Sequence, residues 1–342
     1  MTNETTALAM SGGVDSSVAA ALLLEQGYRV VGLHMLLREE ASSGLERARQ
    51  AAARLGIPLE VADLREPFRR LVLEPWVRAY RQGRTPNPCL ACNPLIKFGA
   101  LLELAAKRFG ASRLATGHYA RLAEAEDGPA LLRGADPHKE QSYFLALVPR
   151  QRLARLLFPL GEMNKRRVRE LAKGLCFWPE LPEESQDVCF LAGEDYRQLL
   201  GEENSPGEIV DLEGRMLGHH HGLWRYTVGQ RRGLGVCAPQ PLYVRRIDAA
   251  ANRLVVAAEG SAPFTWMIVE GLNWLSAPGP EFSCAVRCRY RQEPQGCRAT
   301  LLAGGRLRVE FTRPQRAVAP GQGAVFYEGE RVLAGGLIAE AA

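Results

Sequence analysis

Apolar positions in the first part of the chain follow two alternating periods. Short β-rich runs predict strands over Thr6–Met10, Arg29–Met35, Leu59–Ala62 and Arg113–Ala115. Between them, apolar residues at helical spacing predict helices over Ser16–Gln26, Leu45–Leu55, Leu71–Tyr80 and Ile96–Arg108. This alternation of strands with helices predicts an α/β fold with a parallel, doubly wound sheet that carries helices on both faces.

The pattern changes near residue 200, where Gly, Pro and Ser become frequent over Gly201–Pro206. No helical period follows Gly207, and strands are predicted over Glu208–Leu212, Leu242–Ile247, Arg253–Ala257, Ala285–Gln292, Leu307–Phe311 and Ala324–Tyr327. Short strands at this spacing are typical of small β-domains or a barrel. We therefore expect an α/β domain over 1–200, a small β-rich central domain over 201–258 and a C-terminal β-barrel-like domain over 259–342.

Composition narrows the class of protein without fixing it. The 342 residues carry a net charge of +5, a mild excess that is compatible with a polyanionic partner but does not require one. No signal-like start and no apolar run of about 18 residues is visible, so we expect a cytoplasmic protein with no membrane association. In that compartment the 8 cysteines should be reduced, which favours catalytic, metal-binding or buried roles over structural disulfides.

The most specific chemical signal is Ser11-Gly12-Gly13-Val14-Asp15-Ser16-Ser17, between the first expected strand and helix. Its glycines allow a tight turn, and the N–H groups and dipole of a helix N-terminus suit an anion. The Gly-Lys-Ser/Thr sequence of the common NTPase loop is absent. The segment instead resembles the pyrophosphate loop of ATP pyrophosphatases, which implies a nucleotide-binding sheet and cleavage between the α- and β-phosphates of ATP. Asp15 is expected to help hold Mg²⁺, and Met35 either lines an adenine pocket or belongs to the core.

Two further segments carry cysteines. Asn87-Pro88-Cys89-Leu90-Ala91-Cys92 has CxxC spacing, which suits a redox pair, half of a zinc site or a nucleophile. Its prolines predict a shaped loop rather than a helix. Cys189 lies in the polar segment Glu184–Phe190, just before the expected domain boundary, and alone it indicates no more than a buried thiol.

Together, the order of these segments resembles the tRNA-specific 2-thiouridylases, which make 2-thiouridine at the wobble position of tRNA. Further matches extend to about residue 292 and comprise Thr116–Ala120, Lys139–Leu145, Gly218–Gly222, Tyr226–Gly235 and Arg289–Gln292. The resemblance implies ATP-dependent 2-thiolation of uridine, with adenylation of the C2 oxygen followed by sulfur transfer from a cysteine persulfide. It also implies tRNA as substrate and a persulfide or sulfide donor protein as partner.

The resemblance implies a role for each matching residue. Cys92 is implied as the catalytic nucleophile, and Cys189 as the cysteine that receives a persulfide sulfur. The implied ATP site comprises Ala9, Met10, Ser11, Gly12, Gly13, Val14, Asp15, Ser16, Met35 and Gly117. The implied tRNA contacts are Asn87, Pro88 and Cys89 at the target base, and Lys139, Glu140, Gln141, Arg289 and Tyr290 elsewhere.

Cys89 departs from the family pattern, because some members carry an aspartate at this position. The acid–base role of a carboxylate is therefore absent here, and the proton carrier is left open. Cys89, Cys92 and Cys189 could instead converge as ligands of a four-iron four-sulfur cluster with one open iron. Two routes for the sulfur stay open: a Cys189 persulfide that Cys92 resolves as a disulfide, or sulfide carried by a cluster.

Two other functions fit part of the sequence. A synthetase or amidotransferase of the same superfamily would adenylate a carboxylate and then use ammonia or an amine, without a need for Cys92 or Cys189. A non-catalytic RNA-binding or sulfur-carrier module would not need the Ser11–Ser17 loop, so the intact loop argues against it.

Two basic segments indicate contacts with RNA phosphates. One is Lys165–Lys173, whose five cations face a single carboxylate, Glu170. The other is Cys284–Arg291, where a period of two would place Cys284 and Tyr290 toward the core and the arginines toward solvent or RNA.

Overall fold

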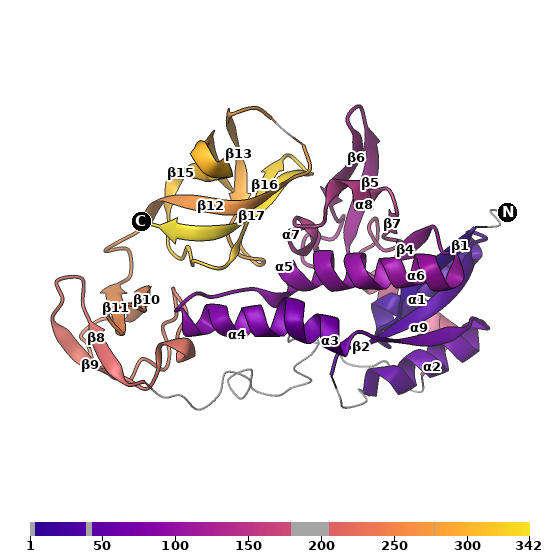
Figure 1. Ribbon diagram of the computed structural model, residues 1–342, viewed down its shortest axis with the longest axis horizontal. Helices are drawn as coiled ribbons and strands as arrows, with labels where there is room; N and C mark the ends of the chain where they lie inside the picture. Colours follow the sequence, from indigo (N-terminus) through magenta and orange to yellow (C-terminus); the bar gives the residue numbers. More distant parts are fainter. Residues whose placement is uncertain (1–3, 39–42, 179–204, 277) are drawn as a thin grey trace.

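The computed structural model describes residues 4–38, 43–178, 205–276 and 278–342, and within these ranges the strands form three sheets (Figure 1). The N-terminal sheet has the order β3-β2-β1-β4-β7, and every pairing in it is parallel. Its strands are β1 (Thr5–Ala9), β2 (Arg29–Leu36), β3 (Leu59–Asp63), β4 (Arg113–Ala115) and β7 (Leu156–Leu157). The strand order reverses between β1 and β4, and open α/β sheets bind ligands at such a switch point, outside the carboxyl ends of the strands.

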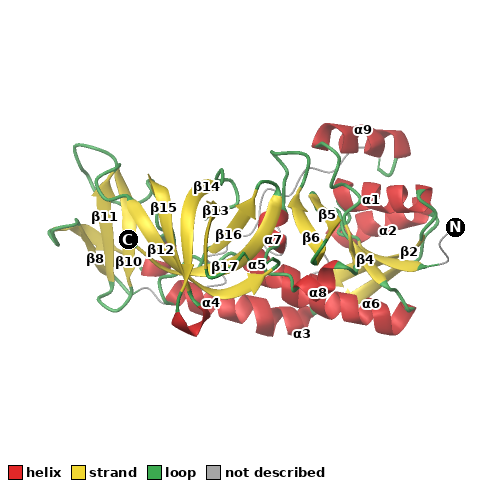
Figure 2. Cartoon of the chain, turned by 90° about the horizontal axis from the view of Figure 1, so that it is seen from above, coloured by secondary structure: helices red, strands yellow, loops and turns green. Residues whose placement is uncertain are grey.

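Helices cover both faces of this sheet, which confirms the expected doubly wound fold (Figure 2). Successive side chains of a strand point to opposite faces. Leu8 of β1 therefore packs with α1 (Val14–Glu25), α2 (Ser43–Leu55) and α9 (Lys165–Leu175). Its neighbours Ala7 and Ala9 belong to a second cluster on the other face, together with Ile96, Phe98, Leu101, Leu102 and Ala105.

That second face is covered by one long helix. It begins as α5 (Pro88–Cys92), continues in the wider π-helical turns of η2 (Asn93–Leu101) and ends as α6 (Leu102–Phe109). Pro88–Phe109 has the length and apolar character of a membrane span, by these criteria alone, and 56% of its most apolar window is buried inside the protein. Burial against the sheet explains this apolar character, since a core helix meets the same criteria.

The expectation of a non-helical loop around Cys89 and Cys92 is wrong, because both lie in the first turns of α5. Pro88 occupies the start of the helix, where its missing N–H breaks no hydrogen bond. Asn87 caps the helix, since its side-chain oxygen accepts a hydrogen bond from the Cys89 N–H at 3.1 Å. Proline and asparagine at these two positions therefore start a helix rather than prevent one.

Shorter elements complete the N-terminal half. A bent helical segment precedes the long helix and comprises α3 (Arg65–Phe68), η1 (Arg69–Leu73) and α4 (Glu74–Arg81). After β4 follow a hairpin of β5 (Ala120–Ala125) and β6 (Gly128–Arg133), then α7 (Ser142–Leu145) and α8 (Arg150–Leu153).

The second half consists of two β-structures, a central sheet and a C-terminal barrel. The central sheet has the order β10-β11-β8-β9, with β8 (Gly207–Val210), β9 (Met216–His220), β10 (Leu242–Asp248) and β11 (Arg253–Ala258). The C-terminal barrel has the order β12-β15-β14-β13-β16-β17, and pairing of β12 with β17 closes it. Its strands are β12 (Phe264–Trp274), β13 (Glu281–Arg287), β14 (Gln295–Leu301), β15 (Leu307–Gln315), β16 (Gly323–Glu328) and β17 (Arg331–Ala341). This confirms the expected C-terminal β-barrel.

Contacts join the three parts of the chain. The β5–β6 hairpin extends the barrel sheet, with Leu132 of β6 paired to Arg331 of β17. Val244 of the central sheet and Phe326 of the barrel belong to one hydrophobic cluster. The division into 1–200, 201–258 and 259–342 stays a prediction, because sheet and core both continue across these limits.

A buried ion pair fastens the α/β part to the barrel. Arg287, at the end of β13, donates from Nη1 to Glu140 Oε2 at 2.6 Å, and the two side chains are 4% and 1% exposed. Arg133 lies 3.8 Å from the same carboxylate. The expectation that Arg287 faces solvent or RNA is therefore wrong. A charge of this kind is buried only where a partner compensates it, and Glu140 is that partner.

Removing either partner of this pair should destabilise the protein strongly, because the other charge would stay buried without compensation. We expect Glu140→Gln and Arg287→Met each to lower the free energy of unfolding by about 3–5 kcal/mol in urea titrations. The exposed pair of Arg298 and Glu281 is the matched control, and Arg298→Met should lower the free energy of unfolding by only about 0–1 kcal/mol. Similar losses at the two pairs would contradict the assignment.

Candidate active site

The phosphate loop connects β1 to α1 at the switch point. Hydrogen bonds of Ser11 stabilise the loop. The Ser11 N–H donates to Ser16 Oγ at 3.3 Å, and the two hydroxyl oxygens lie 3.2 Å apart. The Ser11 Oγ also accepts from the Gly13 N–H at 3.3 Å. Gly12 has φ +80°, and a Cβ there would lie 2.0 Å from the carbonyl oxygen of Gly44, so only glycine fits. The N-cap of α1 is Gly13, which offers no side chain to the N–H groups of the first turn. Such a helix start suits an anionic ligand.

The loop after β4 lies directly against the phosphate loop. A Cβ on Gly117 would lie 2.8 Å from the carbonyl carbon of Asp15 and 2.9 Å from the backbone nitrogen of Ser16. Both loops that border the switch point are thus in backbone contact. A larger residue at position 117 would push them apart.

The side chains before the loop are inside the protein. Ala9 is 9% and Met10 1% exposed, and the Met10 carbonyl accepts from His34 Nδ1 at 2.8 Å. Burial lowers the pKa of His34, so its ring is neutral at pH 7. Met35 is half-buried and packs against the core on the long-helix face. Its contact with adenine stays a prediction.

Asp15 is engaged by two groups. Its carboxylate accepts from Lys165 Nζ at 2.6 and 2.7 Å and from the Tyr119 hydroxyl at 2.8 Å. Mg²⁺ is commonly held by one or two carboxylates together with nucleotide phosphates, so Asp15 fits such a role only if Lys165 moves aside. Within the described ranges no group of three or more His, Cys, Asp or Glu side chains is placed to hold a metal ion.

The long helix carries two thiols, and Cys92 belongs to the same apolar cluster as Ala9 of β1. Cys92 is 9% exposed and Cys89 is half-buried, and residues three apart on a helix are neighbours on its surface. Asn93 Nδ2 supports this turn by donating to the carbonyls of Cys89 and Phe144 at 3.0 and 3.1 Å. Cys189 lies outside the described residues, so its approach to Cys92 stays a prediction.

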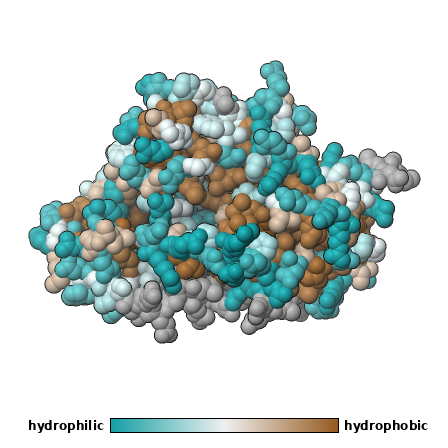
Figure 3. Space-filling model, in the orientation of Figure 1, coloured by the Kyte–Doolittle hydropathy of each residue, from teal (hydrophilic) through white to brown (hydrophobic). Residues whose placement is uncertain are grey.

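The start of the long helix is fixed to the barrel. The Thr85 N–H donates to the Pro320 carbonyl at 2.8 Å, and Gln322 Nε2 donates to the Thr85 carbonyl at 2.9 Å. The Tyr143 hydroxyl donates to the Gly323 carbonyl at 3.1 Å. The segment expected to meet the target base, 87–89, therefore begins where the α/β part meets the barrel, and Figure 3 shows apolar surface in the hollow between them.

Most of the expected tRNA contacts already have partners within the protein. Glu140 forms the buried pair with Arg287, and the Gln141 side-chain oxygen accepts from the Tyr119 N–H at 3.0 Å. Arg289 donates to the Val228 carbonyl. The Tyr290 ring lies 4.3 Å from the Phe144 ring, centroid to centroid. The contacts of these residues and of Lys139 with RNA stay predictions.

His118 follows Gly117 and is buried, with 9% of its surface exposed. Its Nδ1 lies 2.6 Å from Thr116 Oγ1, and its Nε2 lies 3.5 Å from the Nζ of Lys97 in η2. Burial, and next the charge of Lys97, hold the pKa of His118 well below 6.5, so the ring is neutral at pH 7. Lys97 has no part in the sequence-based site, since an apolar helix pattern gives no sign of it.

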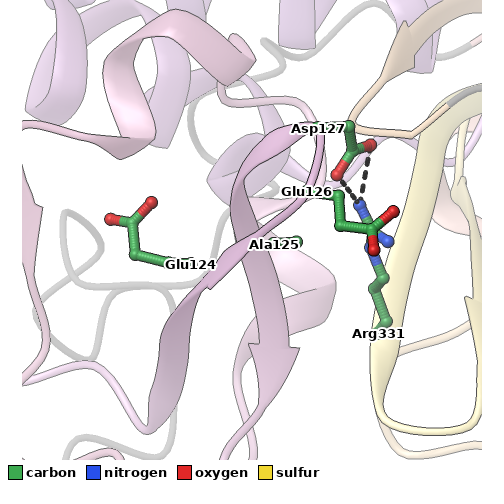
Figure 4. Close-up of a pocket in the computed structure, with 5 residues that line it drawn as sticks. All are labelled: Glu124, Ala125, Glu126, Asp127 and Arg331. Carbon is green, nitrogen blue, oxygen red and sulfur yellow. Dashed lines mark hydrogen bonds and ion pairs between the residues drawn. The ribbon is translucent and has the colours of Figure 1, made fainter.

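An acidic cavity of about 710 Å³ lies at the β5–β6 turn (Figure 4). Asp127 there accepts from Arg331 Nη2 at 2.7 and 2.9 Å, and this hydrogen bond holds the pKa of Asp127 below its usual range. Glu124 and Glu126 add two more carboxylates to the lining. A lining of this charge repels phosphate groups, so the cavity is unsuited to a nucleotide.

A glycine-rich loop at the switch point of a doubly wound sheet defines an α/β protein of the nucleotide-binding class. Family models cover almost all of the sequence: a tRNA methyl transferase HUP domain over residues 4–193, a tRNA methyl transferase PRC-barrel domain over 197–258 and an aminomethyltransferase beta-barrel domain over 264–338. Proteins named tRNA-specific 2-thiouridylase MnmA match nearly the whole length of the chain. The chain belongs to the tRNA-specific 2-thiouridylase family.

Identity to these relatives is high from end to end. It is 47% to the Chloroflexus aggregans protein and 48% to that of Chloroflexus aurantiacus, over 97% of this chain and 97% of each relative. It is 45% to the Acidithiobacillus ferrooxidans protein, over 99% of both chains. Among solved structures, a 4-thiouridine synthetase–RNA complex with bound ATP overlaps 51% of this chain and 41% of its own at a TM-score of 0.37 and 17% identity. An overlap of this extent supports no argument about function.

Gly117→Ala should weaken ATP binding, because the added methyl group would displace the backbone of Asp15 and Ser16. Loss of one hydrogen bond to a charged phosphate corresponds to roughly a tenfold rise in Kd, measurable by calorimetry. Gly174→Ala in α9 is the matched control, since nothing lies within 4 Å of a Cβ there. Unchanged affinity in Gly117→Ala would show that the two loops do not form the nucleotide site.

The neutral state of His118 should make stability dependent on pH. Its pKa in the folded protein lies well below the 6.5 of an unfolded chain, so the unfolded state binds more protons once the pH falls below about 6.5. Stability should therefore be constant above that pH and decline below it. Urea titrations between about pH 5 and pH 8 should show a shallower decline for His118→Gln than for a variant of the exposed His138. An equal decline of stability with falling pH in the two variants would show that His118 is not the source of the pH dependence.

Proposed function

We propose that this chain catalyses the ATP-dependent 2-thiolation of the wobble uridine of tRNA. The observation that carries the proposal is its 45–48% identity to tRNA-specific 2-thiouridylases over nearly the whole length of both chains. The phosphate loop at the switch point and Cys92 on the facing helix support it, because the reaction needs both a nucleotide site and a thiol.

ATP is proposed to bind across the carboxyl ends of β1 and β4. Its pyrophosphate would lie on the Ser11–Ser17 loop, with the α-phosphate toward Gly117. The uridine C2 oxygen then attacks the α-phosphorus and forms a P–O bond, while the bond to the bridging oxygen breaks and pyrophosphate leaves. Adenylation turns a poor leaving group into AMP. Mg²⁺, with Asp15 as its candidate ligand, would supply charge neutralisation at the phosphates when bound.

Sulfur transfer is proposed to use a persulfide on Cys189. Its terminal sulfur attacks C2 of the adenylated base, and AMP leaves with the bonding electron pair. The Cys92 thiolate then attacks the Cys189 sulfur, so that the S–S bond breaks, the thiocarbonyl forms and a Cys92–Cys189 disulfide remains. A dithiol reductant must return two electrons before the next turnover. In this route the sulfane sulfur would come from a persulfide donor protein in the cytoplasm: the Cys189 thiolate attacks the donor's terminal sulfur, and the donor leaves as a thiolate. A sulfide donor would serve only the cluster route.

A second route rests on Cys89. This thiol occupies the position where some relatives have a carboxylate, and it shares the first turns of α5 with Cys92. With Cys189, the two could hold a four-iron four-sulfur cluster, which would supply sulfide from its open iron when bound. No disulfide would form in that case.

Single cysteine substitutions separate the routes. With a persulfide source, ATP and unmodified tRNA, the persulfide route predicts that Cys92→Ser and Cys189→Ser make no 2-thiouridine, while Cys89→Ser keeps much of the activity. The cluster route predicts loss in all three variants, together with loss of bound iron. Cys237→Ser, at an exposed position, is the control. Full activity of Cys189→Ser would contradict both routes, and pyrophosphate release with small carboxylates in the absence of tRNA would favour a synthetase.

A further inference from the structure

Lys97 occupies an unusual stretch of helix close to the proposed chemistry. It lies in the π-helical segment η2, five residues after Cys92 on the same continuous helix. In a π-helix, hydrogen bonds join residues five apart, and such turns are frequent at functional sites. Lys97 is half-buried, with fully buried Ile96 and Phe98 on either side. A lysine at such a position is desolvated on one side without being enclosed.

The hydrogen bond to His118 fixes where the ammonium group lies. An ammonium can only donate, so His118 Nε2 must be the acceptor in the 3.5 Å contact with Lys97 Nζ. The neutral ring then carries its proton on Nδ1, which donates to Thr116 Oγ1 at 2.6 Å. The rings of Phe98 and Phe158 lie 5.9 and 6.0 Å from that of His118 and hold it in place. Thr116, His118 and Lys97 are thus linked by two successive hydrogen bonds.

The charge of Lys97 has no carboxylate to neutralise it. In the part of the chain that the structure describes, its Nζ forms no ion pair, and its polar contact is the neutral ring of His118. Lys165, on the other side of the phosphate loop, has both oxygens of Asp15 as partners. Of these two lysines, Lys97 is the one whose ammonium has no carboxylate partner among the described residues, so it is available to an anionic ligand.

The position of that charge follows from Gly117. This residue precedes His118 in the sequence and packs against the backbone of Asp15 and Ser16, at the start of α1. The hydrogen-bonded series of Thr116, His118 and Lys97 thus starts at the carboxyl end of β4, beside the phosphate loop. It ends on the helix that carries Cys92. A phosphate at the switch point and a base approaching Cys92 would meet along this line.

We propose that Lys97 is a catalytic residue of the adenylation step, in which its Nζ contacts a non-bridging oxygen of the ATP α-phosphate, and that His118 is its positioning residue. This assignment rests on the proposed function. Negative charge on the α-phosphate oxygens is redistributed as the uridine oxygen attacks and pyrophosphate leaves. A preoriented, partly desolvated ammonium stabilises that charge more than water does.

The test is single-turnover adenylation with α-labelled ATP and unmodified tRNA in the absence of any sulfur source. Lys97→Met should lower the rate constant for transfer of the labelled adenylyl group to tRNA by about 10²–10³-fold, while the Kd values for ATP and tRNA change by less than about threefold. Lys97→Arg should restore part of the rate, because it returns the charge. Lys107→Met removes the same group from an exposed position on the same helix and should leave the rate unchanged.

His118→Asn should slow adenylation only through Lys97. The double variant Lys97→Met/His118→Asn should therefore be no slower than Lys97→Met alone, whereas an independent structural effect would add to it. A normal adenylation rate in Lys97→Met would overturn the assignment, and so would a loss of ATP affinity as large as the loss of rate. If the wild-type protein released no pyrophosphate with tRNA, the proposed function itself would fail.

Discussion

The backbone contact between the loop after β1 and the loop after β4 is the constraint on which the rest of the structure depends. Gly117 allows it, since a Cβ would lie 2.8 Å from the Asp15 carbonyl carbon. The contact closes one side of the switch point and places the start of α1 beside His118. Everything proposed for the nucleotide, from the pyrophosphate on the loop to the charge of Lys97, follows from these two loops being held together.

The long helix Pro88–Phe109 connects this nucleotide site to the barrel. Thr85, just before the helix, hydrogen-bonds to Pro320 and Gln322 of the barrel, and the later turns of the helix cover the parallel sheet. The buried pair of Glu140 and Arg287 fastens the same junction a second time. The junction of the α/β part with the barrel is thus held at two places, beside the first turn of the helix that carries Cys89 and Cys92.

Local signals in the sequence predicted much of this, and long-range contacts explain what they missed. The limits of β1, β2, β3 and β4 were predicted to within one residue, because short β-rich runs mark them. The two-residue edge strand β7 was not predicted, since a run of two residues has no period. The helix at Pro88 was missed because proline breaks a helix only in its interior and is favoured at the first helical position, which Asn87 caps here. The burial of Arg287 depends on Glu140, which lies 147 residues away along the chain, and no local pattern reveals such a pair. Lys97 was missed as well, because its contact with His118, 21 residues further along the chain, leaves no local pattern.

The central claim is that ATP is cleaved between its α- and β-phosphates to activate a tRNA uridine for sulfur. Its most direct test follows the wild-type protein with α-labelled ATP, unmodified tRNA and a persulfide source under anaerobic conditions. AMP should form in a one-to-one ratio with 2-thiouridine, which mass spectrometry of the digested tRNA would detect at the wobble position. ADP in place of AMP, or AMP without any thiouridine, would contradict the account.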